Sequence, residues 1–327
     1  MPRKGEARGK LEEIDLTDLT ELPEVGRVTA DKLRSVGIRS IRHLALLTSD
    51  ELVELVGMDP LRAQRILSYA RQMGRVSALV MSAKERKKWR ESLPRLTTGC
   101  KSIDDLLKGG LEPISIYEFA GEFGVGKTQL CHQLSVTAQL SRDRGGIASK
   151  VVYIDTEHTF STERIESIAE RFDLDPELAT ENITVVEPMN VDDLISFVVT
   201  ELPRLVEDGY KLIIVDSIIA RFRSEYVGIE WLARRQQRMN YMLGFLLRIG
   251  KSYGTYTVIT NQVVQVIGRG VNVKAPTGGT IIAHASTHRF FLKKRGNAWA
   301  IEALDSPTLP RGASALYRIT ERGIEDV

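Results

Sequence analysis

The chain of 327 residues has few cysteines and no long apolar run, and each absence excludes a class of protein. Cys100 and Cys131 are too few for a disulfide framework or a cysteine metal site, which predicts a reducing, cytoplasmic location. No apolar stretch approaches the ~20 residues that a membrane helix needs. The basic residues 1–5 are not followed by an apolar segment, so no export signal and no membrane partner are expected.

Acidic residues are absent from residues 231–301, although the net charge of the whole chain is only +2. The same stretch holds these bases: Arg234, Arg235, Arg238, Arg248, Lys251, Arg269, Lys274, Arg289, Lys293, Lys294 and Arg295. Buried strands would explain the missing acids, but they would exclude bases as well. A surface that binds a polyanion such as DNA is the better explanation.

The most informative motif is a glycine-rich loop between a predicted strand, 114–119, and an apolar helix, 130–140. Its residues are Gly121, Glu122, Phe123, Gly124, Val125, Gly126, Lys127 and Thr128. Glycines let successive backbone N–H groups face one phosphate, Lys127 reaches the β and γ phosphates, and Thr128 can hold Mg²⁺. The spacing therefore predicts a site for a nucleoside triphosphate.

Strand and helix patterns alternate after residue 96, which predicts an α/β core with a mostly parallel sheet covered on both faces. The predicted strands are 115–119, 151–155, 183–186, 212–216, 256–261, 289–293 and 299–303. Ligands of such sheets collect at the carboxyl ends of the strands. There we expect Asp216 to bind Mg²⁺, Glu157 to activate the attacking water, and Gln262 to sense the γ-phosphate.

The first part of the chain has a different pattern. Residues 1–10 are expected to be a disordered basic tail, 11–74 a small helical domain, 75–96 a linker and 97–327 the core. The charged run 84–90 predicts a solvated helix or linker face. The segment 22–26 resembles a helix-hairpin-helix module, in which backbone N–H groups around Gly26 would contact a DNA phosphate. An ordinary helical packing domain is the alternative.

Together the motifs resemble the RecA-like recombinases, and within them the archaeal RadA proteins and their eukaryotic relatives. The resemblance covers residues 11–327 and includes the segments 121–133, 155–164, 212–217, 222–226, 235–236, 260–263, 278–287 and 305–310. It implies a RecA-like P-loop NTPase core behind an all-α helix-hairpin-helix domain. It also implies a nucleoid-associated, DNA-dependent ATPase that forms filaments on single-stranded DNA and catalyses homologous pairing and strand exchange with double-stranded DNA.

The resemblance assigns further residues to the ATP site. Glu157, Lys127 and Gln262 form its catalytic set, while Gln129 and Arg164 join the ATP contacts, with Arg164 stacked on adenine. Asp305 and Pro307 cap the nucleotide of the neighbouring subunit. Whether K⁺ also binds near Asp305 is left open.

The resemblance also assigns contacts with DNA and with other copies of the chain. Segments 217–238 and 263–279 match two DNA-binding loops, with contacts expected from Arg223, Arg234, Arg235, Arg238, Arg269 and Lys274. Gly268, Gly270 and Gly278 predict that Arg269 and Lys274, in the second of these segments, belong to a mobile loop. His284 would lie at a subunit interface and help Gln262 couple the γ-phosphate to DNA.

The chain departs from the family pattern at several positions. His158 stands where a glycine is usual, and Ile229, Glu230 and Trp231 replace an Arg-Gly pair and a small or acidic residue. The second DNA segment lacks its usual aromatic residue. Filament assembly in the family uses a Phe-x-x-Ala peptide, but here Val80 and Ala83 are the best match. Valine in place of a buried phenylalanine should weaken each junction by about 1–2 kcal/mol.

Two other functions also fit the sequence. A paralogue that binds DNA and assists the recombinase as a mediator, without long filaments, would fit the weakened linker peptide. The complete catalytic set and the helical domain favour the recombinase. A hexameric helicase with the same core is the third possibility, but segments 278–287 and 305–310 match recombinases instead.

Overall fold

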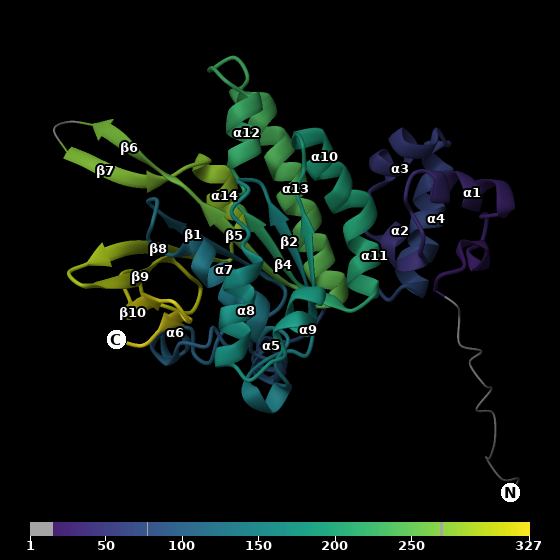
Figure 1. Ribbon diagram of the computed structural model, residues 1–327. Coiled ribbons are helices and arrows are strands. Elements are labelled where there is room, and N and C mark those ends of the chain that lie inside the picture. Colours follow the sequence, from purple (N-terminus) through teal and green to yellow (C-terminus); the bar gives the residue numbers. More distant parts are fainter. Residues whose placement is uncertain (1–15, 77, 269–270) are drawn as a thin grey trace, which may run out of the picture. The chain divides into compact units, whose positions relative to one another are not determined.

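The computed structural model describes residues 16–76, 78–268 and 271–327, and the chain divides after Val80 into two compact units (Figure 1). The predicted tail, residues 1–10, and the predicted DNA contact Arg269 lie outside the described residues. The division falls within the predicted linker, residues 75–96.

The first unit is a small helical bundle, as the apolar spacing predicts. Its elements are η1 (Leu19–Glu21), α1 (Arg27–Ser35), α2 (Ile41–Ala45), α3 (Ser49–Val56) and α4 (Pro60–Met73). Polar residues fix where the later helices begin: Thr48 and Glu51 form a capping box at α3, and Asp59 caps α4. Apolar side chains of α1, α2 and α4 are fully buried and form the core.

The second unit is built on a sheet whose described strands follow the order β11-β10-β9-β8-β1-β5-β4-β2-β3. The strands are β1 (Ser115–Gly121), β2 (Lys150–Asp155), β3 (Ile183–Val186), β4 (Tyr210–Asp216), β5 (Tyr256–Asn261), β8 (His288–Arg295), β9 (Ala298–Asp305), β10 (Ser314–Thr320) and β11 (Gly323–Glu325). All the strands predicted from the sequence are present, and the α/β class is confirmed. Strands β10 and β11 were not predicted.

Strand β8 is where the pairing changes direction. It runs parallel to β1, with His288 opposite Tyr117, and antiparallel to β9, with Arg289 opposite Asp305. The chain therefore leaves β1 at the carboxyl edge of the parallel strands but leaves β9 at the other edge. The loops after β1 and after β9 lie at opposite edges of the sheet.

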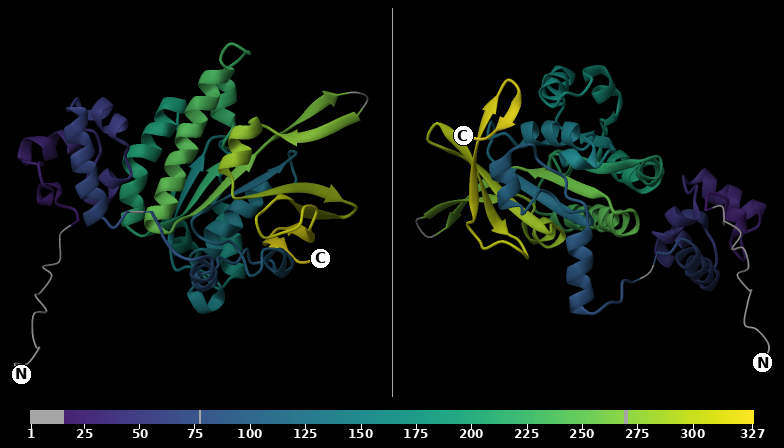
Figure 2. Two further views of the ribbon diagram at one scale, coloured as in Figure 1. Left: turned by 180° about the vertical axis from the view of Figure 1, so that it is seen from behind. Right: turned by 90° about the horizontal axis from the view of Figure 1, so that it is seen from below.

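Helices cover both faces of this sheet (Figures 1 and 2). One face carries α7 (Lys127–Thr137), α8 (Thr162–Arg171) and α9 (Pro176–Glu181), and the other carries α10 (Val191–Ser196), α11 (Leu202–Glu207) and α13 (Leu232–Tyr253). The other helical elements are α5 (Ala83–Ser92), α6 (Lys101–Leu106), η2 (Arg142–Arg144), the π-helical η3 (Phe197–Glu201), α12 (Ala220–Glu225) and α14 (Gly279–Ala285). Within the described ranges, no helix has the length and apolar character needed to cross a bilayer.

The second predicted DNA segment differs from the expected loop. Its described residues form a separate antiparallel pair, β6 (Val263–Gly268) and β7 (Val271–Pro276), which extends away from the main sheet (Figure 2). Alternating β-branched residues such as Val264, Val266 and Val273 favour strands, and this preference outweighs the glycines that suggested a loop. Lys274 therefore lies on a strand.

Candidate functional site

The glycine-rich loop joins β1 to α7 and lies at the carboxyl edge of the sheet. Gly124 and Gly126 have left-handed φ values of 76° and 95°, which other residues rarely adopt. A side chain at Gly121 would stand 2.6 Å from the Leu292 carbonyl oxygen. Because Gly126 offers no side-chain cap to the first turn of α7, the N–H groups there suit a phosphate.

Lys127 lies among the carboxylates at this edge of the sheet. Its Nζ donates to the carbonyl oxygens of Gly121 and Glu122, at 3.0 and 2.7 Å. Burial lowers the pKa of Lys127, and the negative charges of Asp216 and Glu157 act against that shift. The predicted phosphate, metal and catalytic residues are therefore brought together.

Asp216 ends β4 and is almost fully buried. Its carboxylate accepts hydrogen bonds from the hydroxyls of Tyr153, at 2.8 Å, and of Thr260. The Thr128 hydroxyl nearby favours the charged form of this carboxylate. Burial raises the pKa of Asp216, against the effect of these hydrogen bonds. Sequence reasoning missed Tyr153 and Thr260. Tyr153 lies on β2 and Thr260 on β5, and both of these strands pair with β4. A carboxylate oxygen beside the loop threonine is the hard oxygen site that Mg²⁺ prefers.

Glu157 follows β2, and its carboxylate meets two side chains from other strand ends. Ser217 Oγ donates to Glu157 Oε1 at 2.6 Å, and Gln262 Nε2 donates to the same oxygen at 2.7 Å. The buried Asp155 fixes the turn that carries Glu157 by accepting backbone N–H groups within residues 157–160. The predicted base and the predicted γ-phosphate sensor are thus in direct contact. Ser217 was not predicted as a partner.

Gln262 also contacts the first predicted DNA segment. Its Oε1 accepts a hydrogen bond of 3.0 Å from Arg223 Nη1, and Arg223 lies on α12. A continuous path of hydrogen bonds therefore runs from Glu157 through Gln262 to α12. His284 lies exposed on α14, and no hydrogen bond joins it to Gln262 in the part of the chain that the structure describes.

The backbone of His158 has a left-handed φ of 56°, which explains why a glycine suits this position in the related branch. The imidazole lies between two charged groups. Its Nδ1 is 3.3 Å from the Glu187 carboxylate, and its Nε2 is 3.1 Å from the Arg221 guanidinium. The ring therefore bridges an acid and a base beside Glu157.

Arg164 on α8 is fixed by several acceptors. Its Nε donates to Gln129 Oε1 at 2.5 Å, and its terminal nitrogens donate to the carbonyl oxygens of Thr320 and Glu321. These contacts set the plane of the guanidinium, which is the group that would stack on a purine. Gln129 and Arg164, predicted separately, are therefore in contact.

The hairpin of β6 and β7 meets the glycine-rich loop at its exposed side. Lys274 Nζ lies 2.7 Å from Glu122 Oε1, and both side chains are about half exposed. Phe123 is fully exposed beside them. A cavity of about 320 Å³ lies here, lined by Glu122, Phe123, Gln262, Val263, Val264, Gln265 and Lys274.

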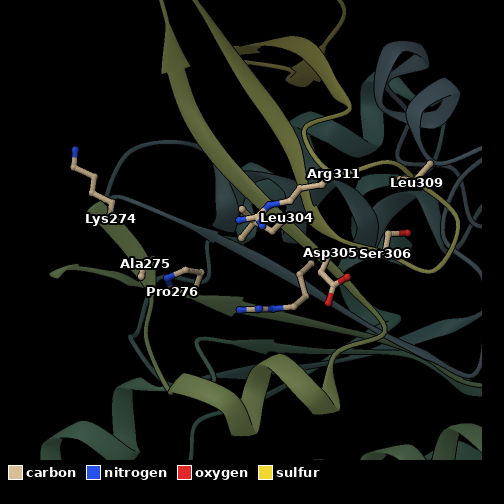
Figure 3. Close-up of a pocket in the computed structure, with 9 residues that line it drawn as sticks. Lys274, Ala275, Pro276, Leu304, Asp305, Ser306, Leu309 and Arg311 are labelled. Atoms are coloured by element: carbon tan, nitrogen blue, oxygen red, sulfur yellow. The ribbon is translucent and has the colours of Figure 1, made fainter. Parts of the chain in front are cut away.

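The predicted cap residues line a second cavity, of about 640 Å³. Figure 3 shows Lys274, Ala275 and Pro276 on one side, with Asp305, Ser306 and Arg311 on the other. Asp305 ends β9 and Pro307 lies on the loop after it, and both are exposed. Since this loop and the glycine-rich loop lie at opposite edges of the sheet, the cap residues do not belong to the phosphate site of their own chain.

The described bases of the acid-free stretch differ in their partners. Several pair with acids outside it, among them Arg238 with Asp192, Lys274 with Glu122, Arg289 with Glu118, and Lys293 with Glu302. Arg234 and Arg235 lie on α13, where the Arg234 guanidinium stands 5.9 Å from the centre of the Trp231 ring. That ring is partly exposed and lies 6.2 Å from the Tyr226 ring.

Two helices of the first unit share a pattern but differ in their caps. α1 follows Gly26 and α4 follows Asp59, and the matching positions are exposed Val28 and Leu61 and buried Ala30 and Ala63. The Asp59 carboxylate accepts the N–H of Arg62 at 2.9 Å, whereas Gly26 offers no side-chain cap. The start of α1 is therefore suited to a phosphate, while a carboxylate at α4 would repel one.

The linker peptide ends where α5 begins. Val80 is 93% exposed, and Ala83 is the first residue of α5. Ser82 and Glu85 form a capping box there, and α5 buries none of its residues, as the charged run 84–90 predicts. An exposed valine is available to another molecule.

Comparisons with known proteins agree with this geometry. The family model described as Rad51 matches residues 89–327, and a model described as a SAM-like helix-hairpin-helix tandem matches residues 16–72. A protein of Ignicoccus hospitalis named "DNA repair and recombination protein RadA" is 44% identical over 325 residues, covering 96% of this chain and 97% of that relative. A protein of Aeropyrum pernix with the same name is 40% identical over 316 residues, covering 95% and 98%.

Proposed function

This chain belongs to the Rad51 family of ATP-dependent DNA recombinases, and we propose how its residues divide the work. It is a DNA-dependent ATPase that acts in DNA repair and recombination by strand exchange. The observation that carries the residue assignments is the convergence of Lys127, Asp216, Glu157 and Gln262 at one edge of the sheet.

ATP is assigned to the glycine-rich loop, with Lys127 on the β and γ phosphates and Gln129 and Arg164 on the side of the base. Mg²⁺ would neutralise charge on the β and γ phosphates when it is bound. Thr128 and Asp216 fit that ion, because both offer oxygen ligands at the same edge of the sheet. Glu157 takes the proton of the attacking water.

The nucleotide is proposed to be shared between copies of the chain. Asp305 and Pro307, exposed at the far edge of the sheet, cap the ATP of the next protomer. Val80 and Ala83 of the linker and His284 on α14 add further contacts between copies. Repetition of this head-to-tail contact produces a filament.

DNA binding is assigned to both units. Single-stranded DNA is held through its phosphates by Arg223, Arg234, Arg235, Arg238, Arg269 and Lys274, and a DNA backbone also contacts the turn at Gly26. Gln262 reports the presence of the γ-phosphate to these segments, so ATP acts as a switch. We place the protein in the cytoplasm, at the nucleoid.

A mediator paralogue is the second candidate, and the exposed Val80 favours it. Without a phenylalanine at that position, self-assembly is weaker and depends more on ATP and DNA. Such a protein would bind DNA and assist another recombinase without forming long filaments.

Electron microscopy with Mg-ATP and long single-stranded DNA tests the proposal. Regular extended filaments are expected, and they should be absent without ATP and with Lys127→Ala. The control is Lys150→Ala, which changes an exposed lysine at the start of β2, whereas the candidate site lies beyond the end of that strand. Discrete particles that still bind DNA would contradict filament formation and favour the mediator.

A further inference from the structure

A buried histidine joins three segments of the second unit. His288 begins β8 and is 3% exposed, with its ring stacked on Tyr117 at 4.6 Å between centres. Its Nε2 lies 3.1 Å from Glu112 Oε1, and its Nδ1 lies 2.9 Å from Ser306 Oγ. One imidazole thus connects the segment before β1 with the loop after β9.

The charge on Glu112 sets the hydrogen positions in this network. Burial acts to raise the pKa of Glu112, but hydrogen bonds from His288 and Arg90 and the charges of Arg90 and Arg95 bring it to about 2. An ionised carboxylate only accepts hydrogen bonds, so His288 Nε2 must carry the proton. The other ring nitrogen, Nδ1, is hydrogen-bonded to the Ser306 hydroxyl.

The fixed hydroxyl of Ser306 in turn shapes the loop. While it is bonded to His288, its oxygen also accepts the backbone N–H of Thr308, at 3.2 Å. Lys108 Nζ donates to the Thr308 carbonyl oxygen at 2.8 Å, which holds the same turn from its other side. Asp305 and Pro307, on either side of Ser306, are both exposed. The hydrogen bond that holds Ser306 against buried His288 therefore determines how Asp305 and Pro307 face the solvent.

We propose that His288, backed by Glu112, is a positioning residue for the nucleotide cap: it holds Ser306 so that Asp305 and Pro307 face the next protomer. This rests on the proposed function, in which those two residues contact the neighbour's ATP. The same carboxylate accepts Arg90 Nε at 2.8 Å, and Arg90 lies on α5, which starts at the linker residue Ala83. The network thus joins the cap to α5, the helix that begins at the predicted linker contact Ala83.

Two variants separate this role from simple packing. Ser306→Ala removes the hydrogen bond to the loop and leaves the pair of His288 and Glu112 intact. His288→Phe keeps a ring on Tyr117 but loses both hydrogen bonds. His288→Asn can still place an amide near the position of Nδ1 and serves as the conservative rescue. Ser102→Ala is the matched control, because it removes a 2.6 Å hydrogen bond to the Leu316 carbonyl oxygen, away from the cap.

The measurement compares the KM for ATP in hydrolysis on single-stranded DNA with the Kd for a fluorescent ATP analogue at low protein concentration without DNA. Ser306→Ala and His288→Phe should raise KM about five- to tenfold, as loss of one hydrogen-bonded contact does. The Kd and the kcat at saturating ATP should stay within about twofold, as should every parameter of Ser102→Ala. His288→Asn should recover part of the KM. If His288 and Ser306 had a purely structural role, the variants would change Kd and thermal stability, and KM would not rise separately from Kd.

Asp305→Ala distinguishes failure of the inference from failure of the proposed function. If Asp305→Ala raises KM but Ser306→Ala does not, His288 does not position the cap and the inference is wrong. If Asp305→Ala also leaves KM unchanged, the cap assignment itself fails and the inference falls with it. Should His288→Phe not fold, Ser306→Ala still decides the question.

Discussion

The side-chain amide of Gln262 donates a 2.7 Å hydrogen bond to Glu157, while its oxygen accepts one of 3.0 Å from Arg223. Since a planar amide cannot turn without disturbing both bonds, a change at either end reaches the other. The amide therefore joins the proposed hydrolysis site to the proposed DNA site through a single side chain.

Glu157→Gln should abolish turnover while preserving binding. A neutral amide cannot take a proton from water, so ATP hydrolysis should fall at least ~100-fold. Binding of ATP and single-stranded DNA should remain, because neither Lys127 nor Asp216 is altered. Hydrolysis assays and nucleotide titrations check this, with Glu187→Gln as a nearby carboxylate control. Loss of nucleotide binding would instead make Glu157 a structural residue.

Arg223→Ala and Gln262→Ala should each remove most of the stimulation of hydrolysis by DNA. Because the two side chains act through one hydrogen bond, the double variant should be little worse than either single one. ATPase rates with and without single-stranded DNA give the comparison. Arg221→Ala, on the same helix but bonded to His158, is the control. Independent, multiplicative losses would show that the path is not used.

Val80→Phe should strengthen self-assembly if the linker peptide is used. A phenylalanine buried in the next protomer would lower the protein concentration needed for assembly about tenfold. Light scattering in the absence of DNA measures it. Val28→Phe, an equally conservative change at another exposed valine, should have no such effect. An unchanged signal for Val80→Phe would place the contact elsewhere.

Gly26→Asp should weaken DNA binding by the first unit. A carboxylate there would take the N–H groups at the start of α1 and repel phosphate, as Asp59 does at α4. The affinity for DNA should fall, and the slope of its logarithm against log salt should drop by about one. Asp59→Gly is the matched control, expected to leave affinity unchanged. Equal effects of both changes would contradict a special role for the first hairpin.

Glu112 should stabilise the core in a pH-dependent manner. Its pKa is about 2 in the folded chain and 4.5 as the ordinary value, so the ionised form favours folding above pH 4.5. That contribution, on the order of 3 kcal/mol, is lost as the pH falls from 4.5 towards 2. Urea unfolding of wild type and Glu112→Gln should show a difference in the free energy of unfolding, and this difference should become smaller as the pH falls over this range. A difference in unfolding free energy that does not change with pH would mean that the carboxylate charge is not involved.

Local patterns in the sequence predict much of this fold. The segment 183–186 becomes β3 with those bounds, and the glycine-rich loop lies between the predicted strand and helix. Gly268, Gly270 and Gly278 predict a loop within residues 263–279, but the structure forms β6 and β7 there. The β-branched residues of this segment favour strands, and Val266 is paired with Val273 across the hairpin. The sequence does not predict β10 and β11 because they are short or mixed in character and depend on distant pairing, β10 with β9 and β11 with β10.

The contacts of the candidate site were harder to predict than its members. Strand-end position indicates Glu157 and Gln262 but not their hydrogen bond, which joins residues 105 positions apart. His288 and Glu112 belong to no motif, and only the parallel pairing of β8 with β1 brings the histidine beside this part of the chain. The positive φ of His158 favours glycine, so the histidine at this position adopts a strained backbone conformation.

The reversal of strand direction at β8 has a consequence for stoichiometry. With the glycine-rich loop at one edge of the sheet and the proposed cap at the other, each complete nucleotide site needs two chains. An open filament then always has one complete site fewer than it has protomers, and its two ends are chemically different. A closed ring has as many complete sites as protomers and no ends. ATP turnover per protomer should therefore rise with filament length and reach its limit when the assembly is long or closed.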